Sequence, residues 1–285
     1  MECQIYPDGI NRGETFQLSR VQLSESVQKL IGSPQGCFII TDRSIYFLSY
    51  DTYEYSVVSI GLIAKEDGDF VADVETTGRW IAAATSDKQL QLFDLRDWAI
   101  GSHVTGGQTL TIHPKSIAVE LQSAVSQLLV LDGRHVAAIA PGKTGTQLSV
   151  FTRRGTKVGS WMLPVLLKRA IAGGLPYRLL ATQANNQRSL LLIDLKPFRI
   201  RQINVELPTP DFLAVTSWGY VVASVLGKII LLDRQGTLVG KIDAPQQITA
   251  IAPIHTSGLM IATVEGTGGV LMTLDLRQFD LDLLF

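Results

Sequence analysis

The segment from residue 211 to residue 254 contains five short apolar runs: DFLAVTS (211–217), GYVVASV (219–225), KIILLDR (228–234), LVGKI (238–242) and ITAIAPI (248–254). Each run is rich in Val, Ile, Leu or aromatic residues, and Gly, Asp, Ser or Pro separates it from the next. Runs of this length between turn residues predict β-strands joined by short turns. The first four runs form one set, and the fifth begins another.

The same order of strands recurs along the chain. One set reads LKRAIAG (167–173), YRLLAT (177–182), SLLLID (189–194) and RIRQINV (199–205), and another opens with DFVADV (69–74), WIAAAT (80–85) and QLQLFD (89–94). The first set spans 27–60, a less regular set spans 126–163, and the last continues with GLMIATV (258–264), GVLMTLD (269–275) and FDLDLLF (279–285). First strands therefore begin near residues 27, 69, 126, 167, 211 and 247.

The spacing of these sets predicts the fold. The steps between first strands are 42, 57, 41, 44 and 36 residues, and propeller blades of the WD40 type repeat every 40–45 residues or so. The sequence therefore predicts an all-β protein, a single closed β-propeller with six four-stranded blades over residues 1–285. Residues 106–125 lengthen one step, either as a long loop or as part of a degenerate seventh blade. Residues 1–26 form an N-terminal extension or a ring-closing strand, with Glu14–Leu23 or Phe279–Phe285 as the outer strand of the last blade.

The ends of the third strands carry a family resemblance. They read LFDL, LIDL, LLDR and TLDL around Asp94, Asp194, Asp233 and Asp275, at the place where WD40 repeats carry their Trp-Asp pair. The chain resembles a diverged member of the WD40-like β-propeller superfamily over residues 27–285, without the Trp and without the family's Gly-His pair. The resemblance implies a role in protein scaffolding. We expect the four aspartates to cap the turns that follow them.

Composition limits the function classes. Hydrophobic residues make up 46% of the chain and charged residues 18%, with a net charge of −1, so no overall field attracts nucleic acid or membrane. The cysteines, Cys3 and Cys37, form no disulfide framework and have no metal-ligand spacing, and no cofactor is implied. No apolar stretch approaches the ~20 residues of a membrane span, and the N-terminus lacks the features of a signal peptide. A cytoplasmic location is expected.

Charge is distributed unevenly along the chain. Between residues 143 and 201 eleven basic residues stand against Asp194 alone. Between residues 42 and 75 the balance reverses, with eight acidic residues against Arg43 and Lys65. In a six-bladed ring the blades that carry these stretches face each other, so the sequence predicts an electrically bipolar molecule. The predicted partner-binding residues, here called the basic sector, are Arg153, Arg154, Lys157, Lys168, Arg169, Arg178, Arg199 and Arg201.

The basic sector suggests an acidic partner, which it would steer by its field. The leading hypothesis is a non-catalytic scaffold or accessory subunit that docks on a larger protein complex. An RNA-binding module is the alternative, because Trp161, Tyr177 and Phe198 lie near the basic residues and could stack on bases. Membrane contact is expected to be peripheral at most.

Catalytic chemistry finds little support. The PGKTGT stretch (141–146) lacks the first glycine of a phosphate-binding loop, since residue 137 is alanine, and a strand rather than a helix is predicted after it. The four histidines have no ligand partners at metal-binding spacing. A metal-dependent propeller hydrolase remains a third alternative, because its ligands would come from different blades; Asn185, Asn186 and Glu265 are the candidates. A small-molecule substrate is not expected.

Overall fold

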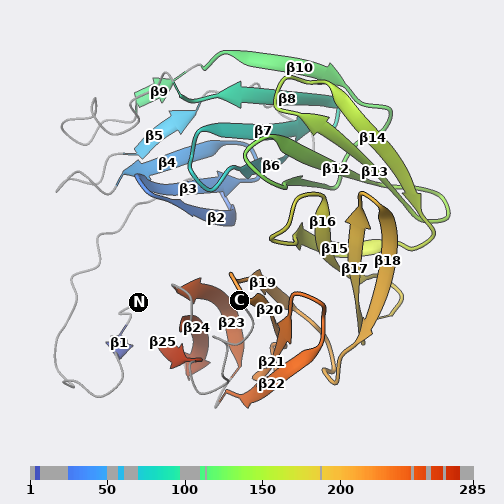
Figure 1. Ribbon diagram of the computed structural model, residues 1–285. Coiled ribbons are helices and arrows are strands. Elements are labelled where there is room, and N and C mark those ends of the chain that lie inside the picture. The colour runs from blue at the N-terminus through green and yellow to red at the C-terminus, as the bar shows by residue number, and fades with distance from the viewer. Residues whose placement is uncertain are drawn as a thin grey trace. The chain divides into compact units, whose positions relative to one another are not determined.

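A computed structural model describes residues 4–6, 25–49, 57–60, 70–96, 110–112, 114–186, 188–244, 247–254, 258–265 and 268–276. Every regular element in these ranges is a β-strand (Figure 1). None of the described residues lies in a helix that could cross a membrane. The strands form six sheets, and the fold is a six-bladed β-propeller, as the repeat predicts.

The chain divides into two compact units, residues 19–166 and residues 1–18 with 167–285, called the middle unit and the terminal unit below. The middle unit holds blade 1 (β2 Val27–Ser33, β3 Gly36–Thr41, β4 Ile45–Ser49, β5 Val57–Ile60, with β9 Leu110–Ile112 added), blade 2 (β6 Val71–Val74, β7 Trp80–Thr85, β8 Gln89–Asp94, β10 Ser116–Glu120) and blade 3 (β11 Gln127–Val130, β12 His135–Pro141, β13 Thr146–Thr152, β14 Lys157–Leu163).

The terminal unit holds the other three blades. They are blade 4 (β15 Leu167–Ala172, β16 Arg178–Gln183, β17 Ser189–Leu195, β18 Phe198–Asn204), blade 5 (β19 Phe212–Val215, β20 Gly219–Ala223, β21 Lys228–Asp233, β22 Leu238–Asp243) and blade 6 (β23 Ile248–Ile254, β24 Gly258–Glu265, β25 Gly268–Asp275, with β1 Gln4–Tyr6). Each blade begins within two residues of the start that the sequence predicts.

The long step contains no seventh blade in its described part. β9 pairs in parallel with β5, while β10 pairs antiparallel with β8 as the outer strand of blade 2. The lengthened segment thus extends two sheets that already exist. The outer position of blade 6 holds β1, which pairs in parallel with β25. The candidates Glu14–Leu23 and Phe279–Phe285 lie outside the described residues.

The middle strands of blade 5 are buried on both faces. All five residues of β20 are buried, as are four in a row in β21. Because neighbouring blades cover both faces of such strands, they need continuous apolar sequence rather than alternation. The outer strands differ: β18 has five exposed residues in succession. Functional surface is therefore to be sought on outer strands and turns.

Packing between neighbouring blades forms the core of each unit. In the middle unit Phe38 and Phe47 of blade 1 pack with Ile81 and Phe93 of blade 2, and the two phenylalanine rings lie 4.8 Å apart between centroids. A second cluster joins blade 2 to blade 3. In the terminal unit one cluster joins blades 4 and 5 and another joins blades 5 and 6. Burying one such aromatic or aliphatic side chain contributes about 1.5–3 kcal/mol.

A buried carboxylate, Asp73 of β6, also joins blades of the middle unit. Its Oδ1 lies 2.5 Å from the ammonium group of Lys29 on blade 1. Its Oδ2 accepts a hydrogen bond of 2.7 Å from the backbone N–H of Val130 on blade 3. The carboxylate thereby satisfies an edge amide of β11 that β12 does not reach, which is why an acid is tolerated at a buried position.

The repeated aspartates are turn residues in part. Asp233 Oδ1 accepts hydrogen bonds from the backbone N–H groups of Gln235 (2.8 Å) and Thr237 (2.7 Å), and Asp94 Oδ1 accepts one from Arg96 (3.1 Å). The predicted capping role is confirmed for these two. Asp194 differs because its carboxylate binds a guanidinium group, described below.

Candidate functional site

The turn between β13 and β14 carries two residues of the basic sector, Arg153 and Arg154. Gly155 closes the turn with φ +81°, and its N–H donates to the Thr152 carbonyl at 2.9 Å. A Cβ at Gly155 would lie 2.8 Å from Cγ2 of Val119 on β10. Glycine is therefore needed twice, for the left-handed backbone and for the close approach. The basic turn consequently rests on the outer strand of blade 2.

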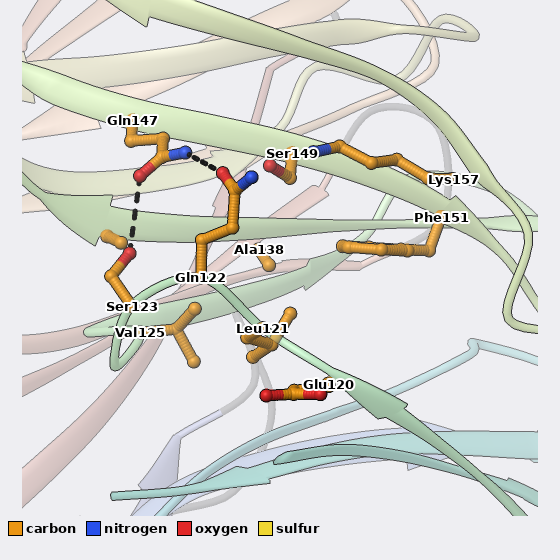
Figure 2. Close-up of a pocket in the computed structure, with 11 residues that line it drawn as sticks. Glu120, Leu121, Gln122, Ser123, Val125, Ala138, Gln147, Ser149, Phe151 and Lys157 are labelled. Carbon is orange, nitrogen blue, oxygen red and sulfur yellow. Dashed lines mark hydrogen bonds between the residues drawn. The ribbon is translucent and has the colours of Figure 1, made fainter. Parts of the chain in front are cut away.

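Beside this turn lies a pocket between blades 2 and 3, with a volume of about 230 Å³. Figure 2 shows its lining side chains converging from the end of β10, the loop that follows it, and strands β12 and β13. They are Glu120, Leu121, Gln122, Ser123, Val125, Ala138, Ala140, Gln147, Ser149, Phe151 and Lys157.

The pocket exists because the strand register of blade 3 places small side chains side by side. Ala138 of β12 stands opposite Ser149 of β13, and Ser149 stands opposite Ser160 of β14. In the next row of the sheet Phe151 fills the space between the blades. A row of Ala and Ser cannot reach across the usual sheet separation of about 10 Å, so a hollow remains.

Carboxamide and hydroxyl groups line one wall of the pocket. Gln147 Nε2 donates to Gln122 Oε1 at 2.8 Å, and the Ser123 hydroxyl donates to Gln147 Oε1 at 3.3 Å (Figure 2). The Ser149 and Ser160 hydroxyl groups lie 3.0 Å apart. Within the described part of the chain, Gln122 Nε2 has no hydrogen-bond acceptor. It leaves a donor available at the pocket.

The charges around the pocket are mainly positive. Lys157 lines one end, and Arg154 and Arg153 of the basic turn stand three and four residues before it in the sequence. Glu120 supplies an opposing carboxylate on the β10 side. Asp94 lies near enough for Arg153 to contribute to lowering its pKa, but the main cause is the hydrogen bond from Arg96, which already neutralises it. The lining itself thus carries one charge of each sign, and the excess positive charge comes from Arg153 and Arg154 of the turn.

The size of the pocket limits what it can hold. Small-molecule and cofactor sites usually measure about 300–1,000 Å³, and this pocket is smaller. It has an apolar floor of Leu121, Val125 and Phe151, a polar wall and a basic end. This combination leaves room for one side chain but not for a ligand of the usual size.

The remaining basic residues lie in the terminal unit. Lys168 and Arg169 are exposed on β15, and Arg199 and Arg201 are exposed on β18. The Arg169 guanidinium donates to the Asp211 carbonyl oxygen, and Arg201 Nη1 donates to the Gln235 carbonyl oxygen at 2.5 Å. These contacts fix the side chains in place while leaving their charge at the surface.

Arg178 has a different role from its neighbours. Its Nε and Nη2 donate to the two carboxylate oxygens of Asp194 at 2.6 and 3.1 Å, and the Arg178 side chain is only 11% exposed. This hydrogen bonding to Asp194 raises the pKa of Arg178 further above its ordinary value. Arg178 also donates to the Arg234 carbonyl oxygen on blade 5 at 2.9 Å. It is a structural residue, and we leave it out of the proposed surface.

Two of the three described acids of the acidic stretch are buried. Asp42 is exposed, but Asp73 and Glu75 are each 7% exposed. Glu75 accepts hydrogen bonds from the Thr77 hydroxyl and from the backbone N–H of Arg79. The other five acids, Asp51, Glu54, Glu66, Asp67 and Asp69, lie outside the described residues. The sequence prediction treated all eight acids as surface charges. The residues next to an acid do not indicate whether its carboxylate is buried and hydrogen-bonded within the protein.

The aromatic residues proposed for base stacking are not equally available. The Lys196 ammonium lies 4.4 Å from the centroid of the Tyr177 ring and covers it. Trp161 is half-buried, whereas Phe198 is 45% exposed between basic residues. A single accessible ring is less than the succession of aromatics on which single-stranded nucleic acids stack.

The 141–146 stretch and the candidate metal ligands form no catalytic site among the described residues. Residues 142–145 form the turn between β12 and β13, and Thr146 begins a strand, so the phosphate-loop interpretation is correctly rejected. Asn185 and Asn186 are exposed in the connection between β16 and β17. Over the described ranges, three or more His, Cys, Asp or Glu side chains nowhere gather as metal ligands would.

Comparison with known proteins adds evidence on the fold. No known protein-family profile matches the sequence, and no curated protein matches it. Among solved structures, a chain of the mitotic checkpoint complex crystal structure is similar, with a TM-score of 0.55 and 10% sequence identity. The similarity covers 95% of this chain and 87% of that one. At this identity the likeness concerns the fold alone.

The comparison therefore supports the β-propeller fold of this chain.

Proposed function

We propose that this protein is a non-catalytic, cytoplasmic scaffold subunit that docks on a larger protein complex through an acidic partner. The observation that carries the proposal is the basic turn beside the pocket between blades 2 and 3. Arg153 and Arg154 approach the partner's acidic residues, and the pocket receives one of its side chains. The positive side chains set orientation and association rate, while the apolar floor supplies affinity.

Two properties support a protein partner over a substrate. The pocket, at about 230 Å³, is below the usual range for small molecules. Its polar wall is built from neutral amides and hydroxyls that already bond to one another, an arrangement that can recognise a partner. The exposed pairs Lys168–Arg169 and Arg199–Arg201 extend the basic sector in the terminal unit.

Affinity purification of the tagged chain from its native source, followed by mass spectrometry, tests the proposal. The variant Arg153→Glu with Arg154→Glu should lose an acidic partner that the wild type recovers. The double variant Arg43→Glu with Arg79→Glu is the matched control, since both side chains are exposed and lie outside the basic sector. Equal recovery by the wild type and both variants would remove the basic turn from the docking surface.

RNA binding is distinguished by its salt dependence. If RNA is the partner, affinity should fall as salt rises. For single strands, the logarithm of the association constant should fall with the logarithm of the salt concentration, with a slope of roughly −0.7 for each phosphate contact. An acidic protein recovered after nuclease treatment supports the docking proposal. Loss of all recovery on nuclease treatment supports RNA.

A further inference from the structure

Strand β10 presents an open sheet edge next to the pocket. It pairs with β8 on one side, and no strand of the described chain pairs with its other side (Figure 1). The pairing with β8 runs from Ser116 to Glu120 without a register shift. The strand is exposed except at Val119, and the Ile117 side chain is 43% exposed. A regular, exposed edge of this kind is a template for an added strand.

The backbone groups of alternate residues point toward the open side of β10. The Asp94 N–H donates to the Lys115 carbonyl oxygen at 3.2 Å, and the Leu121 N–H donates to the Lys88 carbonyl oxygen at 2.7 Å. Hydrogen-bonded and non-hydrogen-bonded pairs alternate along antiparallel strands. The odd-numbered residues from 115 to 121 therefore bond to β8. The residues whose N–H and C=O groups face outward are Ser116, Ala118 and Glu120.

Other outer strands of the protein are less suited to pairing. The edge of β5 is already covered by β9. The pairing of β14 shifts at Val150/Phe151 and that of β22 at Leu231/Leu232, and such bulges twist an edge and hinder pairing. β18 pairs without a shift, but it contributes no residue to the pocket. β10 is both regular and continuous with the pocket.

Positive charge lies along the first half of this edge. A Cβ at Gly155 would lie 3.1 Å from Cγ2 of Ile117, so the basic turn with Arg153 and Arg154 rests on this part of the strand. Lys115, which is exposed, comes directly before the strand. An acidic side chain on an added strand is therefore attracted to this half of the edge.

The acids beside the edge differ in what they contribute. Asp94 stands beside the start of the strand, but the Arg96 guanidinium binds its carboxylate, with Nε 2.9 and 3.0 Å from the two oxygens. Glu120, the last residue of the strand, is exposed and lines the pocket. It repels an acidic side chain at that end. The edge therefore favours an acid at its start and an uncharged residue at its end.

The spacing along β10 defines what the added strand carries. Leu121 lies in the floor of the pocket, four residues after Ile117, and side chains four apart in a strand share one face. We propose that an extended segment of the acidic partner adds as a strand to the edge of β10, with an acid opposite Ile117 and an apolar side chain opposite Leu121 in the pocket. This inference rests on the docking role proposed above and names the partner's motif, an acid and an apolar residue four positions apart.

Ala118→Pro tests the main-chain contacts of the added strand. Proline removes the outward N–H of residue 118 and leaves the hydrogen bonds to β8 in place, and edge strands tolerate proline on their open side. Gln202→Pro on β18 is the matched control. Since the Val205 N–H donates to the Arg188 carbonyl oxygen, the same alternation places the Gln202 N–H on an open edge. Circular dichroism and thermal unfolding verify that both variants are folded.

The binding probe is a synthetic peptide with blocked ends, Thr-Glu-Thr-Val-Thr-Leu-Thr, titrated by fluorescence anisotropy. Its Glu and Leu have the spacing that the edge requires. Ala118→Pro should weaken binding about tenfold or more, because the added strand loses a main-chain hydrogen bond and the close approach to the edge. Gln202→Pro should leave the affinity within about twofold of wild type. A peptide with Lys in place of Glu should bind about fivefold more weakly.

Amide hydrogen exchange of the wild type gives a second readout that needs no variant. With the peptide bound, the outward N–H groups of Ser116, Ala118 and Glu120 should exchange about tenfold more slowly or less, because they become hydrogen-bonded. Contacts made by side chains alone leave these three rates unchanged. No binding by the wild type, unchanged exchange at these amides, or equal weakening by the two proline variants would overturn strand addition.

Partner recovery separates this inference from the docking role. If Arg153→Glu with Arg154→Glu loses the acidic partner while Ala118→Pro retains it, docking stands and strand addition is wrong. If the arginine variant retains the partner, the docking role is wrong. Strand addition is then still decided by the peptide titration and by amide exchange, neither of which requires the natural partner.

Discussion

Replacing Asp73 is the most informative test of how the middle unit is held together. Asp73→Ala removes a carboxylate that contacts the Lys29 ammonium on blade 1 and the Val130 N–H on blade 3. The two residues of the ion pair differ in solvent exposure. The Asp73 side chain is 10% exposed, and the Lys29 side chain is 44% exposed.

The magnitudes follow from these environments. A hydrogen bond to a charged group contributes about 1.5–3 kcal/mol, and a donor left unsatisfied costs about 1–3 kcal/mol. An ion pair open to solvent on one side contributes about 1 kcal/mol or less. We expect Asp73→Ala to lower the free energy of unfolding by about 3 kcal/mol. Lys29→Ala should lower it by about 1 kcal/mol, and Asp73→Asn, which can still accept from Val130, should lie between the two.

Thermal and urea unfolding, followed by circular dichroism, measure these differences. For a unit of this size each 1 kcal/mol shifts Tm by roughly 2–4 °C, so the two alanine variants are readily separated. Asp42→Ala, at an exposed acid of blade 1, is the control and should stay within about 0.5 kcal/mol of wild type. If Lys29→Ala costs as much as Asp73→Ala, the ion pair rather than the Val130 hydrogen bond dominates, and the reasoning fails.

Three further predictions follow from the described contacts. Tyr220→Phe removes a buried hydroxyl that donates to the Gly173 carbonyl at 3.0 Å and should cost about 1 kcal/mol. Burial raises the pKa of Tyr220 above its ordinary 10.0, so the stability that Tyr220 contributes should be constant below pH 10 and decline above it. The difference in unfolding free energy between wild type and variant, measured at each pH, should therefore shrink above pH 10. Burial likewise raises the pKa of the Cys37 thiol, so in a Cys3→Ser background iodoacetamide should modify it more slowly at pH 8 than a free peptide thiol; an equal rate would contradict this. Ser149→Leu should fill the pocket, change stability by less than about 1 kcal/mol and abolish partner recovery; undiminished recovery would show that the pocket is not the docking site.

The blades were predictable because their middle strands have to be apolar throughout. β20 and β21 are covered on both faces. Their consecutive residues are therefore apolar, and this pattern recurs from blade to blade. The outer strands were harder to predict. β1 is three residues long and β10 follows its blade after a long connection, and neither carries a local pattern that indicates which sheet it joins.

The candidate site was predictable only in its charge. The excess of basic residues between 143 and 201 is visible in the sequence, and one of them, Lys157, lines the pocket. The sequence did not predict that Arg178 is excluded from the partner-binding surface. Its partner Asp194 stands sixteen positions away and contacts it only through the pairing of β16 with β17. The same holds for Asp73, whose partners belong to two other blades.

The sequence by itself determined the six-bladed fold, since strand periodicity, turn residues and repeat length are all local properties. Tertiary structure alone decided which charges remain at the surface and where a cavity lies. The pocket depends on Ala138, Ser149 and Ser160 standing in one row, and residues on three strands become neighbours only when the register is set. Small side chains alone do not predict a cavity, because a cavity forms only where the packed strands leave the space beside them unfilled.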